Sequence, residues 1–224
     1  IYTKPSSAAS DVYKRQGLGI PMKNSVLAVA VLSLFAGTTM AQQSPWMIRA
    51  RAVQINMDNQ DSTGLGLSVN DKTIPEFDIS YFFTPQLAVE LILSVPQKQT
   101  VHSAVLNADA GTFKHLPPTL MAQYHFTGLS GFKPYVGLGY NVTQISAVHL
   151  DAASNALGVP VTLDGHSSGP AYQLGVDFPI DKQWSFNIDL KKVDIKTHVY
   201  AGGVSSGTLK LDPMLLGVGL GYRF

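Results

Sequence analysis

Apolar residues recur at every second position along most of the chain after residue 45, where they alternate with polar or small residues. This period of two is that of a β-strand, whose successive side chains point to opposite faces. The pattern is clearest near the end, where Met214, Leu216 and Val218 begin one face and three glycines stand on the other. Segments with this pattern predict eight strands, at 46–57, 74–83, 87–95, 116–126, 136–143, 172–180, 184–191 and 214–224.

The faces opposite the apolar residues carry charged and polar side chains. They include Arg49, Arg51, Glu76, Asp78, Glu90, His125, Asp177, Asp189, Lys191 and Arg223. An apolar outer face of this extent would aggregate in water, so the pattern predicts a transmembrane β-barrel with a charged interior. The alternative is a soluble eight-stranded barrel, which would turn its apolar face inward around a ligand. In the membrane barrel the interior charges must pair, and we expect them to plug the half near the short turns.

The connections between the predicted strands alternate in length. Segments 84–86, 127–131 and 181–183 are short, whereas 58–73, 96–115, 147–167 and 201–208 are longer and rich in Gly, Ser, Asn and Asp. An up-and-down barrel has this arrangement, with short turns toward the periplasm and long loops outside. The predicted fold is therefore all-β, an eight-stranded antiparallel transmembrane barrel over residues 42–224.

An export signal precedes the predicted strands. Met22 is followed by a lysine, an apolar core at 26–35 and small residues up to Ala41, which is the plan of a secretory signal peptide with cleavage expected after Ala41. The apolar core has about half of the roughly 20 residues that a membrane-spanning helix needs. Residues 1–21 do not fit this plan, and we expect them to be upstream or non-native leader sequence.

The composition limits the chemistry of the chain. Sixteen Lys and Arg stand against 15 Asp and Glu, and this net charge of +1 provides no broad cationic field for nucleic acid. The chain has no cysteine, which excludes disulfides, thiol nucleophiles and thiolate metal sites. Its six histidines are scattered, and it has no Gly-x-Ser-x-Gly turn. We expect no catalysis, no metal and no cofactor, and a barrel enzyme is the third hypothesis.

The chain from Trp46 to Phe224 resembles the OmpW family of outer-membrane proteins. Its most specific matching stretches are His115-Leu116-Pro117-Pro118-Thr119-Leu120 and Gly221-Tyr222-Arg223-Phe224. The resemblance implies an eight-stranded barrel with a hydrophobic passage that is entered from outside, closed toward the periplasm, and open sideways so that small apolar molecules can leave into the membrane. It also implies roles in stress adaptation and, for some members, as a bacteriocin receptor.

The resemblance also suggests where a gate would lie. The family's gate has a Leu and a Trp, which correspond here to Ile92 and Ser168, so one large apolar wall is lost. Leu116, Pro117 and Pro118 are candidates for the side exit, because proline lacks the N–H that a strand ladder needs. The alternative is that these prolines only begin a strand.

The expected function is a narrow passage or binding site for small hydrophobic molecules. The alternative is a structural or receptor barrel with a filled lumen, acting in stress adaptation or as a bacteriocin or phage receptor. Expected partners are outer-membrane lipid, small hydrophobic molecules and the outer-membrane insertion machinery, because Phe224 ends a strand that resembles its assembly signal. We expect a monomer in the bacterial outer membrane.

Overall fold

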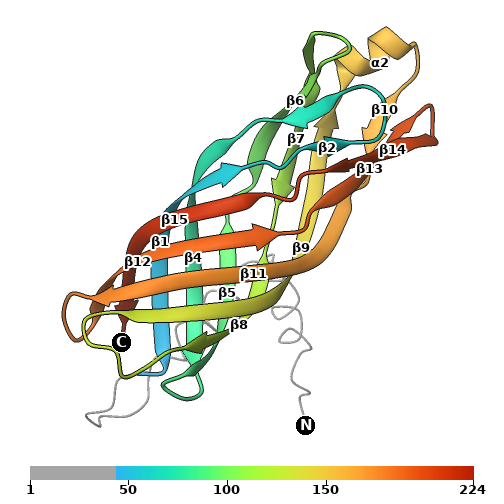
Figure 1. Cartoon of the computed structure of the whole chain (residues 1–224). Helices are drawn as coiled ribbons and strands as arrows, with labels where there is room; N and C mark the ends of the chain where they lie inside the picture. Colours follow the sequence, from blue (N-terminus) through green and yellow to red (C-terminus); the bar gives the residue numbers. More distant parts are fainter. Residues whose placement is uncertain (1–43) are drawn as a thin grey trace, which may run out of the picture. The chain divides into compact units, whose positions relative to one another are not determined.

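The computed structural model describes residues 44–224, so the predicted leader at 1–21 and signal peptide at 22–41 lie outside the described residues. Eight antiparallel strands form a closed barrel (Figure 1). They are β1 (Trp46–Asn56), β4 (Lys72–Phe82), β5 (Leu87–Ser94), β8 (Thr119–His125), β9 (Lys133–His149), β11 (His166–Pro179), β12 (Trp184–Val193) and β15 (Met214–Arg223). The barrel closes because β15 pairs with β1 and β11 pairs with β9. The predicted eight-stranded barrel is confirmed.

The two faces of the barrel wall differ as the alternation predicted. Leu138 and Leu174 point outward and are 65% and 58% exposed, whereas Arg49 and Glu90 point inward and are 2% and 0% exposed. An apolar exterior around a polar interior is the arrangement of a barrel in lipid. Among residues 44–224, no helix is both long and apolar enough to cross a bilayer.

The short connections lie together at one end of the barrel. In the turn before β5, the Thr84 hydroxyl accepts hydrogen bonds from the N–H groups of Gln86 and Leu87. Aromatic rings gather at this end in edge-to-face pairs, such as Trp46 with Tyr81, whose centroids are 4.8 Å apart. Rings with one apolar and one polar edge suit the boundary between lipid and water.

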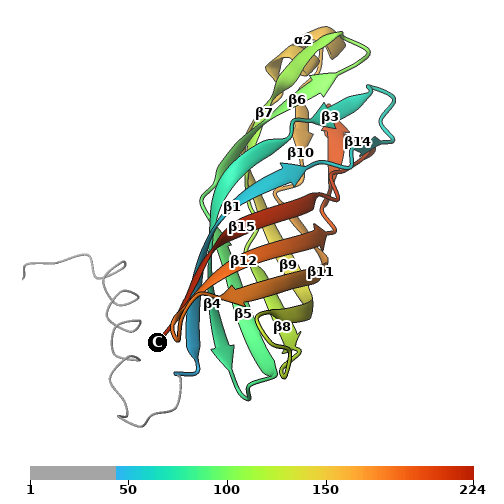
Figure 2. The ribbon, with the colours of Figure 1, turned by 60° about the vertical axis from the view of Figure 1, so that its left-hand side comes forward.

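The long connections are not irregular loops, as their composition had suggested. They contain β2 (Gln60–Asp61), β3 (Leu67–Val69), β6 (Gln97–Ser103), β7 (Ala108–Leu116), α2 (Asp151–Leu157), β10 (Val161–Leu163), β13 (Lys196–Ala201) and β14 (Val204–Lys210). Strands β7, β6 and β3 continue the wall beside β9, and β10, β13, β14 and β2 form a second sheet. Figure 2 shows this extension rising beyond the end of the barrel opposite the short turns.

Two tight turns explain why these extensions form hairpins. Gly202 and Gly203 join β13 to β14 with positive φ angles of 57° and 81°, as a two-residue hairpin turn requires. Asn107, before β7, has a φ of 48°, a conformation that asparagine tolerates better than most residues. Glycine and asparagine, which are typical of loops, therefore occupy hairpin turns between regular strands here.

Candidate functional site

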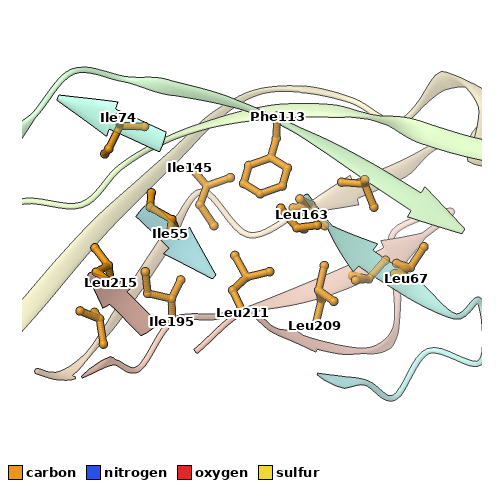
Figure 3. Close-up of a cluster of buried hydrophobic side chains, with 14 of the residues drawn as sticks. Ile55, Leu67, Ile74, Phe113, Ile145, Leu163, Ile195, Leu209, Leu211 and Leu215 are labelled. Carbon is orange, nitrogen blue, oxygen red and sulfur yellow. The ribbon is translucent and has the colours of Figure 1, made fainter. Parts of the chain in front are cut away.

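The interior of the barrel has two layers. Toward the short turns lies the charge network, whose members are 5% exposed or less: Arg49, Arg51, Glu76, Asp78, Glu90, Asp177, Asp189 and Lys191. Beyond it lies the apolar cluster: Val53, Ile55, Leu67, Val69, Ile74, Ile92, Val101, Ala110, Phe113, Met121, Ile145, Leu150, Ala153, Val161, Leu163, Ala171, Val193, Ile195, Val199, Leu209, Leu211 and Leu215. Figure 3 shows side chains of this cluster converging from several strands.

Two arginines of β1 form the centre of the charge network. Because they stand two residues apart on a strand, both point into the barrel. Arg49 lies 2.9 Å from Asp177 and 3.3 Å from Asp78. Arg51 lies 2.5 Å from Asp78 and 3.0 Å from Glu76. These contacts tie β1 to β4 and, across the interior, to β11.

Lys191 completes the network from β12. Its Nζ lies 2.8 Å from Glu76 and 2.5 Å from Asp189. Glu90 of β5 lies 3.3 Å from Arg49. The network therefore sets three cations against five carboxylates, and each of these charged groups has at least one partner of opposite sign.

Neutral donors satisfy the carboxylates that exceed the cations in number. Gln173 Nε2 donates to Glu90 at 2.9 Å and to Asp189 at 2.8 Å. Gln123 donates to Glu90 at 2.8 Å, and the Tyr135 hydroxyl donates to Asp189 at 2.8 Å. Such donors lower the cost of burying a carboxylate. The predicted network contained only ionisable residues, and the inward polar positions of the alternating strands could have identified the glutamines.

Tyr135 fits into this layer because a glycine faces it. A Cβ atom added at Gly175 would lie 2.2 Å from Cζ of the Tyr135 ring, which no real contact allows. The ring fills the space beside β11 and lies 5.4 Å under the Arg49 guanidinium. Gly175 thus permits an aromatic side chain to close the interior next to the charges.

His125 and Arg223 lie below the charge network, at the end with the short turns. His125 stacks on Tyr135 with centroids 4.8 Å apart and contacts Gln123 at 3.0 Å. Arg223 does not join the charge network, contrary to the prediction. Its guanidinium lies 4.1 Å over the Phe82 ring, it donates to the Ser44 carbonyl oxygen, and within residues 44–224 it has no ion pair. A cation at the barrel end can stay partly hydrated, so it needs no buried partner.

Ile92 marks the boundary between the two layers. It follows Glu90 on the inner face of β5, is 3% exposed and belongs to the apolar cluster. This placement explains why one isoleucine stands among the polar positions of that strand. An apolar guest could contact Ile92 without meeting an unpaired charge.

The barrel wall is interrupted beside the apolar cluster. Strand β5 pairs with β8 only as far as Ile92 and Thr119, and β6 pairs with β7 only from Gln97 and His115. Between these pairs, residues 93–96 and 116–118 form no ladder pair with each other in the part of the chain that the structure describes. We call this interruption the wall gap.

Prolines account for the wall gap. Pro96 stands on one edge and Pro117 and Pro118 on the other, and none of them has an N–H to donate across it. The second edge remains attached to β9, because the Pro118 carbonyl oxygen accepts hydrogen bonds from the Val142 N–H and the Asn141 side chain. Pro117 and Pro118 therefore both precede β8 and interrupt the ladder, and a side exit at this place stays a prediction.

Two of the expected passage residues do not face the interior. Ser168 is exposed on the outer face of β11, where its hydroxyl accepts a hydrogen bond from Tyr140 at 3.2 Å. Its neighbours Ser167 and Gly169 are the buried positions, so Ser168 does not face the interior as the expected gate residue would. The side chain of Leu116 also points outward, because its neighbour His115 is the buried position, and Leu116 lies on the edge of the wall gap.

The fold and its two faces define a class: an integral β-barrel protein of the bacterial outer membrane. Among the described residues, no group of three or more His, Cys, Asp or Glu side chains is arranged to hold a metal ion. The model of the OmpW family matches residues 36–224, so the chain belongs to the OmpW family.

Relatives and solved structures agree with this assignment. An uncharacterized outer-membrane protein, y4mB, of Sinorhizobium fredii is 39% identical over 189 residues, which are 81% of this chain and 80% of that protein. A dibenzothiophene metabolism operon protein, PahQ, of Pseudomonas aeruginosa is 25% identical and is covered over its whole length by 91% of this chain. The crystal structure of the outer membrane protein OprG from Pseudomonas aeruginosa is similar with a TM-score of 0.71 and 27% identity, over 82% of this chain and 97% of that one.

Proposed function

We propose that this barrel passes small hydrophobic molecules from outside into its apolar cluster and releases them through the wall gap into the membrane. The observation that carries the proposal is the position of the gap, which lies beside the apolar cluster and above the charge network. A molecule that follows this route lies in the apolar cluster and enters lipid without crossing the charge network.

The straight route to the periplasm is unfavourable for an apolar molecule. It would have to separate ion pairs such as Arg49 with Asp177, which lie in a dry interior. Breaking one buried ion pair costs about 3–5 kcal/mol, and an apolar guest offers no replacement partner. The sideways route breaks no ion pair of the charge network. The name of the relative PahQ, which refers to the metabolism of an apolar aromatic compound, is consistent with such a cargo.

A cross-link over the wall gap tests the exit. The chain has no cysteine, so Val95→Cys with Leu116→Cys introduces one reactive pair on the outer side of the two edges of the gap, which a short bifunctional thiol reagent can join. We expect cross-linking to lower the uptake of N-phenyl-1-naphthylamine by Gram-negative cells to the level of cells without the protein, and cleavage of the link to restore it. The uncross-linked double variant must give the uptake of the wild type.

The matched control is a cross-link where the ladder is intact. Leu91→Cys with Leu120→Cys joins a directly paired position of β5 and β8, below the gap. This link should leave uptake unchanged. In a second arm, Ile92→Arg should block uptake whereas Ser205→Arg, on the exposed β14, should not. Folding of each variant is checked by its heat-dependent shift in electrophoretic mobility.

The alternative of a receptor barrel with a filled lumen is favoured by one observation. Both interior layers are packed, and their members are almost fully buried. The same experiment separates the two functions. Equal uptake by cells with the wild type and cells without it, together with no effect of the gap cross-link, would contradict the passage and leave the receptor function.

A further inference from the structure

Four polar side chains line the inner face directly beside the wall gap. Ser94 ends β5, Gln97 and Gln99 point inward from β6, and His115 faces Gln97 across the β6–β7 ladder. We call these residues the polar edge. Gln99 is 0% exposed and His115 is 4% exposed, so they meet the interior and not the solvent.

Most of the polar edge has unused hydrogen-bonding capacity. Within residues 44–224, neither polar atom of the Gln99 amide has a partner, and the same holds for Nδ1 of His115 and the hydroxyl of Ser94. Only Gln97 is engaged there, through its donation to the Val95 carbonyl oxygen at 2.8 Å. Buried polar groups of proteins are nearly always hydrogen-bonded, so three such residues at one place require an explanation.

The surroundings of these groups are apolar. Gln99 lies between Gln97 and Val101 on its strand and opposite Phe113 on β7. Both Val101 and Phe113 belong to the apolar cluster. A leucine at position 99 would fill similar space without an unpaired amide, and a polar ligand is the partner that would compensate for the glutamine.

We infer that the polar edge binds the polar group of an uncharged amphiphilic molecule, such as a long-chain alcohol, ketone, ester or amide, while the apolar cluster holds its chain. This inference rests on the proposed passage and names the class of molecule that the passage selects. The Gln99 amide can donate and accept at once, which suits a hydroxyl or carbonyl group.

The charges of the interior favour an uncharged ligand over an anion. The polar edge contains no Lys, Arg, Asp or Glu, and the charge network below it has five carboxylates against three cations. Lys72 of β4 is a cation beside this edge, and it donates to the Lys98 carbonyl oxygen at 3.0 Å. A carboxylate ligand would meet dipoles and this one partly engaged cation, so its desolvation would be compensated only in part. A hydroxyl or carbonyl loses far less on leaving water.

Ligand titrations of the full chain in lipid nanodiscs test the inference. The probes are decane, 1-decanol and decanoate, which share a chain and differ at one end. Methyl signals of Ile92 and Val101 report entry into the apolar cluster, and the side-chain amide signal of Gln99 reports contact with the polar edge. We expect decane and 1-decanol to shift the methyl signals, and only 1-decanol to shift the Gln99 amide.

Gln99→Leu and Gln54→Leu form a matched pair of variants, because Gln54 lies on the outer face of β1. Both probes partition into the same lipid, so the measured quantity is the ratio of their affinities. One neutral hydrogen bond corresponds to a loss of about three- to tenfold in the preference for 1-decanol over decane in Gln99→Leu. Gln54→Leu should keep the preference of the wild type.

The outcomes distinguish this inference from the proposed function. If no probe shifts the methyl signals, the passage itself is contradicted. If all three probes shift them equally and Gln99→Leu keeps the wild-type preference, the passage stands and the polar edge has no role in selection. If decanoate binds as well as 1-decanol, the ligand class is not limited to uncharged molecules. Loss of the 1-decanol preference only in Gln99→Leu supports the inference.

Discussion

The two layers of the interior are equally buried but are held together in different ways. In the charge network each group is fixed by directional bonds, such as those of Arg49 to Asp177 and Asp78. In the apolar cluster, Phe113, Leu209 and their neighbours make contacts without direction. A network of ion pairs has one good arrangement, whereas apolar side chains can repack around a guest at lower cost. The first layer is therefore suited to closing the barrel, and the second to admitting a molecule.

The wall follows the same division. Around the charge network the ladder between β5 and β8 is continuous, with pairs from Leu87 and Tyr124 to Ile92 and Thr119. Beside the apolar cluster the wall is interrupted by prolines. The layer that is expensive to open thus has the intact wall, and the adaptable layer lies beside the wall gap.

The largest expected effect comes from removing one cation from the charge network. Arg51→Met leaves Glu76 and Asp78 with fewer opposite charges in a dry interior. We expect the free energy of unfolding to fall by about 3–5 kcal/mol, because a buried charge loses its compensation. The measurement is guanidinium unfolding in micelles, followed by the fluorescence of Trp46 and Trp184.

The matched control removes a cation outside the interior. Lys210 is exposed on β14, and Lys210→Met should change the free energy of unfolding by no more than about 0.5 kcal/mol. A loss below about 1 kcal/mol for Arg51→Met would mean that the charges are hydrated, and the contrast between the layers would fail.

A smaller effect is expected from truncating the apolar cluster. Leu209 is 0% exposed inside the barrel extension, and Leu138 is 65% exposed on the outer face. Leu209→Ala loses both the transfer free energy and the contacts around a cavity, in total about 2–5 kcal/mol. Leu138→Ala loses only the transfer part, because fluid lipid fills the space. The same unfolding assay compares them, and equal losses would show that the apolar cluster is loosely packed.

The sequence predicted the barrel because alternation is a local property. Leu138 and its neighbours on β9 alternate with glycines, which predicts a strand with one apolar face. The charged residues opposite such faces on other strands then assign the apolar side to lipid. Strands β6 and β7 were missed because their inner faces mix Gln97 and His115 with Val101 and Phe113, so no apolar face was visible. Their pairing depends on a hairpin turn at Asn107 and not on periodicity.

The candidate site was predictable in kind but not in detail. The alternation of residues along β1, β4 and β12 indicated which charged side chains point inward, and most of them are buried in the structure. In a narrow barrel, each inward ionisable group lies close to another. Ser168 was expected at the gate from the family resemblance and not from the pattern of its own strand, where adjacent positions face opposite sides. The wall gap required the register of two strand pairs, which no single segment contains.

The smallest expected effect concerns the pH dependence of stability that comes from an exposed carboxylate outside the charge network. Asp181, in the turn after β11, accepts hydrogen bonds from the N–H groups of Trp184 and Gln183, each at 2.7 Å. These bonds lower the pKa of Asp181 below its ordinary value of 3.8. A lowered pKa in the folded state stabilises the barrel above the unfolded value, and this contribution disappears as the pH falls through the folded pKa.

Asp181→Asn keeps an oxygen acceptor in the turn but removes its titration. We expect the variant to lose a small part of the acid sensitivity of the unfolding midpoint, measured between about pH 2 and pH 7, and only below the ordinary pKa of a carboxyl group. Because Asp181 is fully exposed, solvent screens its contribution. Sensitivity that persists in the variant then belongs to other carboxylates, including those paired with Arg49 and Arg51. If Asp181→Asn instead removed all of the acid sensitivity, the buried carboxylates would contribute none of it. Acid would then not weaken the charge network more than the apolar cluster.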